Sequence, residues 1–72
     1  MNEIGKSLKI ARIESGLKQR EVAQEIGVLT ETISSWETGR YSPTIDNAIK
    51  LARVYGKSLD ELFCRQTALK VK

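Results

Sequence analysis

The 72-residue sequence contains no histidine and one cysteine, Cys64. Without an imidazole the chain lacks the commonest general base, and one thiol can form neither an internal disulfide nor a Cys/His zinc cluster. Glycine-rich phosphate loops of the G-x-x-x-x-G-K-[ST] or G-x-G-x-x-G type are also missing. We therefore predict that the protein is not an enzyme and uses no cofactor or metal.

Long apolar runs are missing as well. No stretch approaches the roughly 18 apolar residues of a membrane-spanning helix. The start of the sequence, residues 1–4, lacks the basic and apolar segments of a signal peptide. We expect a cytoplasmic protein without membrane contact, in a compartment where a lone thiol stays reduced.

The composition is that of one small globular domain, with 40% hydrophobic and 29% charged residues. We predict a folded domain over residues 1–66 and a basic C-terminal tail over residues 67–72. The net charge is +3, but Arg65, Lys70 and Lys72 lie in an acid-free end, which leaves the rest of the chain formally neutral. Charge alone therefore gives weak support for nucleic-acid binding.

Glycines at positions 16, 27, 39 and 56 each follow apolar residues at helical spacing, as expected at helix ends. No segment alternates as a strand does or contains a hairpin dipeptide, so the sequence predicts an all-α fold of short helices and tight turns. The predicted inward stripes are Ile4, Leu8 and Ala11; Val22, Ala23 and Ile26; Ile33 and Trp36; and Ile45, Ala48, Ile49, Ala52 and Tyr55.

A fifth helix is predicted from a capping box near the C-terminus. In this motif a serine hydroxyl and a glutamate carboxylate three residues later each accept from the other's backbone N–H. Ser58 and Glu61 have this spacing, and Leu62 and Phe63 continue the helix.

The stretches LKQREVAQEIGV at 17–28 and TISSWETGR at 32–40 belong to one pattern. It closely resembles the lambda-repressor and Cro-like helix-turn-helix superfamily of XRE-type regulators, with the small Ala23 where two helices cross and W-E-x-G-R closing the third helix. The likeness continues through Pro43 and residues 56–62, so it covers nearly the whole chain. The resemblance implies a compact five-helix DNA-binding domain that acts in transcription control, usually as a homodimer on a two-fold operator.

The third predicted helix, residues 30–37, is the candidate for reading bases. Eight residues span about 12 Å, which suits a major groove of about 12 Å. With Ile33 and Trp36 turned inward, helical spacing turns hydroxyls and a carboxylate outward, where they can contact base edges. The candidate base-reading residues are Thr30, Glu31, Thr32 and Ser35. The alternative is that these side chains are solvated and that Glu31 stabilises the helix dipole.

Contacts to the DNA backbone are predicted on either side of this helix. Gln19 occupies the position that bonds a phosphate in the resembled family, with a solvated side chain as the alternative. Lys18 departs from the usual Ser, Thr or Asn cap, and a phosphate contact would compensate for that. Thr44 is equally well explained as the cap of the fourth helix. The predicted phosphate ligands are Lys18, Gln19, Arg40, Tyr41 and Thr44.

Leu29 is a second departure, because the family usually has a small polar cap before the recognition helix. Either Thr30 acts as the cap and shifts the helix start by one residue, or Leu29 makes an apolar contact with a thymine methyl or a sugar. The sequence leaves both open.

Arg12 and Glu37 lie beside apolar stripes, and the resembled family often pairs a basic residue of the first helix with the glutamate closing the third. We predict this ion pair, which would hold the recognition helix in place if it is partly buried. Two exposed charges with almost no mutual effect are the alternative.

A dimer surface is predicted around the fifth helix, where the resemblance places family dimer contacts. The candidates are Leu59, Leu62, Phe63, Leu69 and Val71. The first three could instead belong to the core. Cys64 is interpreted as a small apolar filler, with an intersubunit disulfide as the alternative. Ile10, Ile13 and Val54 lie opposite the core stripes of their helices and are expected on the surface.

Together these features predict a sequence-specific DNA-binding transcriptional regulator, with double-stranded DNA as its partner. We expect a repressor that acts as a homodimer on a pseudo-palindromic operator. The alternative is an antitoxin or another protein-binding regulator of a toxin or restriction-type system, in which an apolar surface binds a second protein. A module that has lost DNA binding is a further alternative, for which Glu31 and the neutral body are the arguments.

Overall fold

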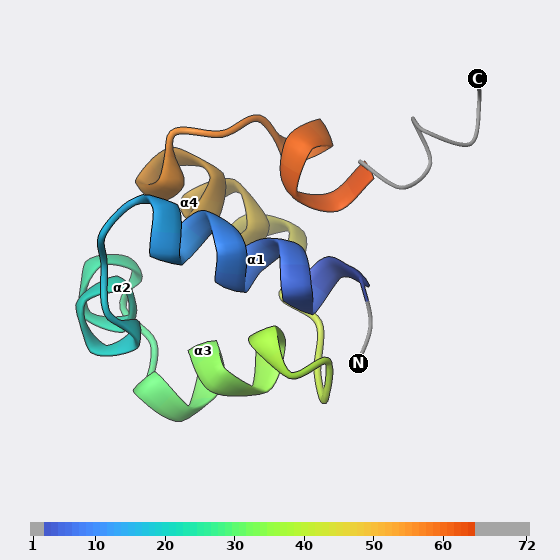
Figure 1. Ribbon diagram of the computed structural model, residues 1–72. Coiled ribbons are helices and arrows are strands. Elements are labelled where there is room, and N and C mark those ends of the chain that lie inside the picture. Colours follow the sequence, from blue (N-terminus) through green and yellow to red (C-terminus); the bar gives the residue numbers. More distant parts are fainter. Residues whose placement is uncertain (1–2, 65–72) are drawn as a thin grey trace, which may run out of the picture.

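The computed structural model describes residues 3–64, which form four α-helices and one π-helical turn (Figure 1). The elements are α1 Glu3–Glu14, α2 Gln19–Ile26, α3 Thr30–Glu37, α4 Ile45–Tyr55 and η1 Asp60–Cys64. No strand occurs in this part of the chain, so the predicted all-α class with five helical elements is confirmed. No helix within it is long and apolar enough to cross a membrane.

The helix ends follow the local signals in the sequence. All four glycines predicted at helix ends have positive φ. Gly27 is the clearest case: at φ 79° it ends α2 in the left-handed region, where a side chain would be strained, and its N–H donates to the carbonyl of Ala23 at 2.9 Å. The predicted capping box is present, since Ser58 N–H donates to Glu61 Oε1 at 2.8 Å and Glu61 N–H to Ser58 Oγ at 3.1 Å.

Helix α1 crosses the middle of the molecule, with α3 on one side and η1 on the other, while α2 packs against both α3 and α4 (Figure 1). The apolar stripes meet in one core, and Ile4 packs against its edge. The core residues are Leu8, Ala11, Val22, Ala23, Ile26, Ile33, Trp36, Leu51, Ala52, Tyr55 and Leu62. This arrangement buries the inner face of α3 and leaves its other face at the surface.

Three residues of α4 differ from the prediction. Ile45 is 74% exposed, because it is the first residue of the helix and lies beyond the edge of the core. Leu51 fills the core from this helix instead, although the predicted stripe omitted it. Val54, expected on the surface, is partly buried and packs against the core.

The predicted dimer surface also needs correction. Leu62 is only 2% exposed, because η1 packs on α1 and turns this side chain into the core, where a second copy cannot reach it. Phe63 is partly buried against the same core, whereas Leu59 is exposed. Leu69 and Val71 lie outside the described residues, as do the side chain of Cys64 and the predicted tail.

Candidate nucleic-acid interface

Helices α2 and α3 are joined by a three-residue turn that fixes the placement of α3. Gly27 ends α2, and the next N–H, that of Val28, donates to Ala23 at 2.9 Å. Val28 is partly buried against the core, which ties the turn to the body of the domain. Ile33 and Trp36 are buried as predicted, so α3 presents its polar side outward.

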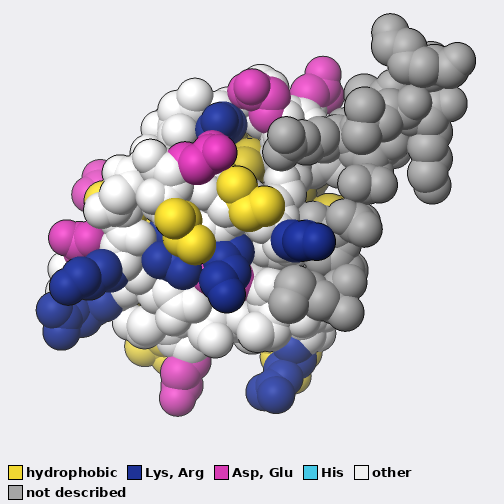
Figure 2. Space-filling model, viewed as in Figure 1, with side chains coloured by type: hydrophobic (Ala, Val, Ile, Leu, Met, Phe, Trp, Pro, Cys, Tyr) yellow, Lys and Arg dark blue, Asp and Glu magenta, His cyan; other side chains and the backbone are white. Residues whose placement is uncertain are grey.

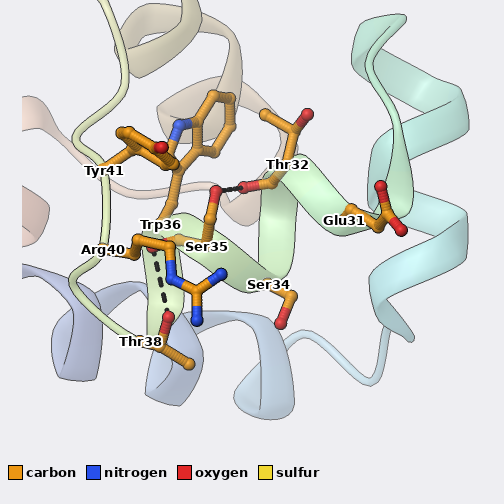
Figure 3. Close-up of a pocket in the computed structure, with 8 residues that line it drawn as sticks. All are labelled: Glu31, Thr32, Ser34, Ser35, Trp36, Thr38, Arg40 and Tyr41. Atoms are coloured by element: carbon orange, nitrogen blue, oxygen red, sulfur yellow. Dashed lines mark hydrogen bonds between the residues drawn. The ribbon is translucent and has the colours of Figure 1, made fainter.

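Three of the four predicted base-reading residues lie together. Glu31, Thr32 and Ser35 line a hollow of about 750 Å³ on the outer side of α3 (Figure 3). Ser35 Oγ donates to the carbonyl of Thr32 at 2.9 Å, so toward a ligand this hydroxyl can act only as a hydrogen-bond acceptor. Thr30 is exposed at the first turn of the helix and does not line the hollow.

The loop after α3 folds back onto the same helix. The backbone N–H groups of Arg40 and Tyr41 both donate to the carbonyl of Ser35, at 2.9 and 3.2 Å. Both side chains are exposed and line the hollow with the residues of α3 (Figure 3). The structure thus brings a cation and a phenol predicted to contact phosphate next to residues predicted to contact bases.

The start of α3 has no side-chain cap. Helix α3 begins at Thr30, and Leu29 occupies the N-cap position with extended backbone, φ −80° and ψ 152°. Thr30 is therefore not the cap, which removes one of the two interpretations of this end. Leu29 is 69% exposed, and its side chain lies at the surface next to the base-reading helix.

Lys18 and Thr44 are the N-cap residues of α2 and α4, and the two helices are capped in different ways. The ammonium group of Lys18 can only donate hydrogen bonds, so it cannot accept from the N–H groups at the start of α2. One half of a capping box is formed by Glu21, whose Oε1 accepts from the backbone N–H of Lys18 at 2.8 Å. The Lys18 side chain remains exposed. Thr44 caps α4 directly, because its Oγ1 accepts from the N–H of Asn47 at 3.2 Å. Thr44 is therefore a helix cap, as the alternative interpretation had it. The hydrogen of its hydroxyl remains available to a phosphate.

Glu37, the last residue of α3, is 3% exposed and has partners on both neighbouring helices. The predicted pair with Arg12 is present and bidentate: Arg12 Nε lies 2.7 Å from Oε2, and Nη2 lies 3.2 Å from Oε1. Arg12 Nη1 also donates to the carbonyl of Leu17 at 2.9 Å. The hydrogen bond to Glu37 raises the pKa of Arg12. The buried carboxylate thus ties α3 to α1.

Gln19 is oriented by the same carboxylate, which the sequence did not indicate. Its Nε2 donates to Glu37 Oε1 at 3.0 Å, so one amide N–H is committed within the protein. The second amide N–H and the backbone N–H in the first turn of α2 are the groups left for a phosphate. Glu37 therefore connects the end of the base-reading helix with a residue predicted to contact the DNA backbone.

The contacts of Glu37 with Arg12 and Gln19 form a junction between α1, α2 and the end of α3. Gly5 also belongs to this junction, and the sequence patterns did not single it out. A Cβ at this buried position would lie 2.5 Å from the carbonyl oxygen of Glu37 and 2.8 Å from that of Trp36. Both are backbone atoms that cannot rotate away, so glycine is needed for α1 to approach α3 this closely. A signal was present, because a glycine inside a helical pattern lowers helix stability by about 1 kcal/mol relative to alanine and so calls for a packing explanation.

Comparison with known proteins places this chain in a family. A family model described as helix-turn-helix matches residues 8–62. An uncharacterized HTH-type transcriptional regulator of Archaeoglobus fulgidus is 40% identical over 52 residues, which cover 72% of this chain and 74% of the relative. The cryptic phage CTXphi transcriptional repressor RstR of Vibrio cholerae is 43% identical over 51 residues, 71% of this chain and 46% of the relative.

The fold is also found among solved structures. The P22 c2 repressor, crystallised in complex with a synthetic operator, superimposes with a TM-score of 0.79 at 24% sequence identity, over 86% of this chain and 94% of that chain. This likeness confirms the lambda-repressor-like architecture predicted from the sequence.

Proposed function

This chain belongs to the helix-turn-helix family, and on that premise we propose that it binds double-stranded DNA as a sequence-specific transcriptional regulator. Helix α3 is the recognition helix. The observation that carries the proposal is the polar outer side of α3 on a helix with several tertiary contacts: Ile33 and Trp36 are buried on its inner side, and Glu37 joins its end to α1 and α2. Base contacts need side chains whose positions are fixed before binding.

The side chains on this surface fit direct readout. The Thr30 hydroxyl can donate to or accept from several base edges, the Ser35 hydroxyl can accept from a base amino group, and the carboxylate of Glu31 can accept from cytosine N4. Arg40 and Lys18 supply positive charge for the phosphates on either side. Glu31 near phosphates lowers non-specific affinity, so its role would be discrimination between sequences.

We propose further that the protein acts as a homodimeric repressor on a pseudo-palindromic operator. Two similar proteins, RstR and the P22 c2 protein, are named as repressors, and the latter was crystallised with a synthetic operator. In such a dimer two copies of α3 would enter major grooves about 34 Å apart. Exposed Leu59 and partly buried Phe63 are the dimer candidates that remain within the described residues.

Selection of bound duplexes from a random pool, followed by titration of the winner at several salt concentrations, tests this function. With two or three phosphates neutralised per subunit, log affinity should fall against log salt with a slope of about −4 to −5. The double replacement Thr30→Ala and Ser35→Ala should abolish the sequence preference. Ser7→Ala, in the groove between α1 and η1, is the matched control and should leave it intact.

Absence of enrichment at low salt, with a chain that is folded by circular dichroism, would refute the proposal. It would favour the alternative of a protein-binding regulator. Hydrophobic side chains lie over α1 in the centre of the face shown in Figure 2, and Ile10 and Ile13 are exposed on that helix. Double replacement of these two isoleucines by serine would then be the next test.

A further inference from the structure

The side of α1 that faces α3 is marked by two contacts at opposite ends of the helix. Gly5 lies directly against the carbonyl oxygens of Trp36 and Glu37. Arg12, two turns later, binds the Glu37 carboxylate at 2.7 Å. A line along α1 from Gly5 to Arg12 therefore runs beside the C-terminal end of the recognition helix.

Lys9 lies on this same line. It follows Gly5 by four residues and precedes Arg12 by three, the two spacings that place side chains on one face of a helix. Unlike these neighbours, Lys9 is exposed, so it lies at the edge of the junction and not within it. Figure 2 shows Lys and Arg side chains along the seam between α1 and α3 and over α2, on one face of the molecule.

The junction also fixes where Lys9 lies relative to the predicted phosphate ligands. Gln19 reaches the same carboxylate, at 3.0 Å, and thereby brings the first turn of α2 to this end of α3. Arg40 follows α3 by three residues, and its backbone N–H donates to the carbonyl of Ser35 at 2.9 Å. We infer that Lys9 is a ligand for a DNA phosphate, which extends this set of backbone contacts onto α1. The inference rests on the proposed function.

The opposite side of α1 has a different charge pattern and supplies the control. Lys57 lies there, in the groove between α1 and η1, 3.3 Å from Glu14 and beside Glu61. Carboxylates at this position repel phosphate, and the groove is on the far side of α1 from the line through Gly5 and Arg12. Lys9 and Lys57 therefore differ in location while their removal changes the net charge equally.

The test compares Lys9→Gln with Lys57→Gln and with Lys9→Arg on the selected duplex over a range of salt concentrations. Each contact with a phosphate contributes about −0.9 to the slope of log affinity against log salt. We expect Lys9→Gln to reduce the steepness by about one per subunit and to weaken binding several-fold on all sequences alike. Lys57→Gln and Lys9→Arg should keep the parent slope.

A Lys9→Gln slope equal to that of the parent, with the parent bound to its duplex, would overturn this inference and leave the proposed function standing. A parent that binds no duplex at any salt concentration would overturn both. Circular dichroism of each variant checks that the helices are intact, and replacement of an exposed lysine by glutamine should not unfold α1.

Discussion

The two ends of the recognition helix are built in opposite ways. At its C-terminal end, buried Glu37 binds Arg12 and Gln19, and the backbone lies against Gly5. At its N-terminal end, Leu29 provides no side-chain cap and is exposed. Polar side chains of α1 and α2 therefore hold the C-terminal end of α3, whereas Val28 and Ile33 hold its N-terminal end by apolar packing and leave the Leu29 side chain exposed.

The largest expected effect comes from breaking the fixed end. In Glu37→Ala the guanidinium of Arg12 loses its buried partner, and an uncompensated charge of this kind costs about 3 to 5 kcal/mol. Urea unfolding followed by circular dichroism measures this loss. Glu14→Ala, which removes the exposed pair with Lys57, is the control and should cost less than about 1 kcal/mol. Equal losses in the two variants would show that Glu37 does not hold α3.

The next effect comes from filling the close approach between α1 and α3. Gly5→Ala should destabilise the fold by about 2 kcal/mol, because the new Cβ meets backbone carbonyls and the helices must separate. Helix propensity alone predicts the opposite sign, a gain of roughly 1 kcal/mol. Thermal unfolding beside Lys6→Ala, at an exposed position of α1, distinguishes the two. A more stable Gly5→Ala variant would contradict the crossing described above.

A smaller effect is expected from pH, through Tyr55 beneath the same junction. Burial, and then the charge of Glu37, raise the pKa of Tyr55 from 10.0 to about 12. The folded chain thus holds this proton more tightly than the unfolded chain. The contribution to stability is complete below pH 10 and is lost as the pH rises towards 12, by about 1 to 2 kcal/mol. Denaturant unfolding at pH 9 and pH 11.5 should show the loss, and Tyr55→Phe should reduce it.

The smallest effect concerns the uncapped end. Leu29→Ser gives α3 a side-chain acceptor for its first N–H groups and should raise the unfolding free energy by roughly 0.5 to 1 kcal/mol. Leu29→Ala removes the same side chain without providing a cap and should leave stability nearly unchanged. If both variants bind the selected duplex more weakly while Leu29→Ser is more stable, the leucine serves DNA contact. Unchanged binding would assign it no such role.

The candidate site could be predicted in part. The outward residues of α3 followed from the inward direction of Ile33 and Trp36, which is a local periodicity. The orientation of Gln19 could not be predicted, because its partner Glu37 lies 18 residues away. Sequence spacing also could not decide whether Leu62 faces a second copy or its own core, since both would require an apolar side chain.

The helices and their ends follow from local sequence, because glycines such as Gly27 and the capping box at Ser58 act through groups at most four or five residues apart. Together with the family resemblance it also indicated the pairing of Arg12 with Glu37 and which helix carries the base-reading residues. How α3 is held became visible in the packed fold. The close approach at Gly5 and the shared carboxylate of Glu37 depend on helices that are distant in the chain and meet only in the packed core.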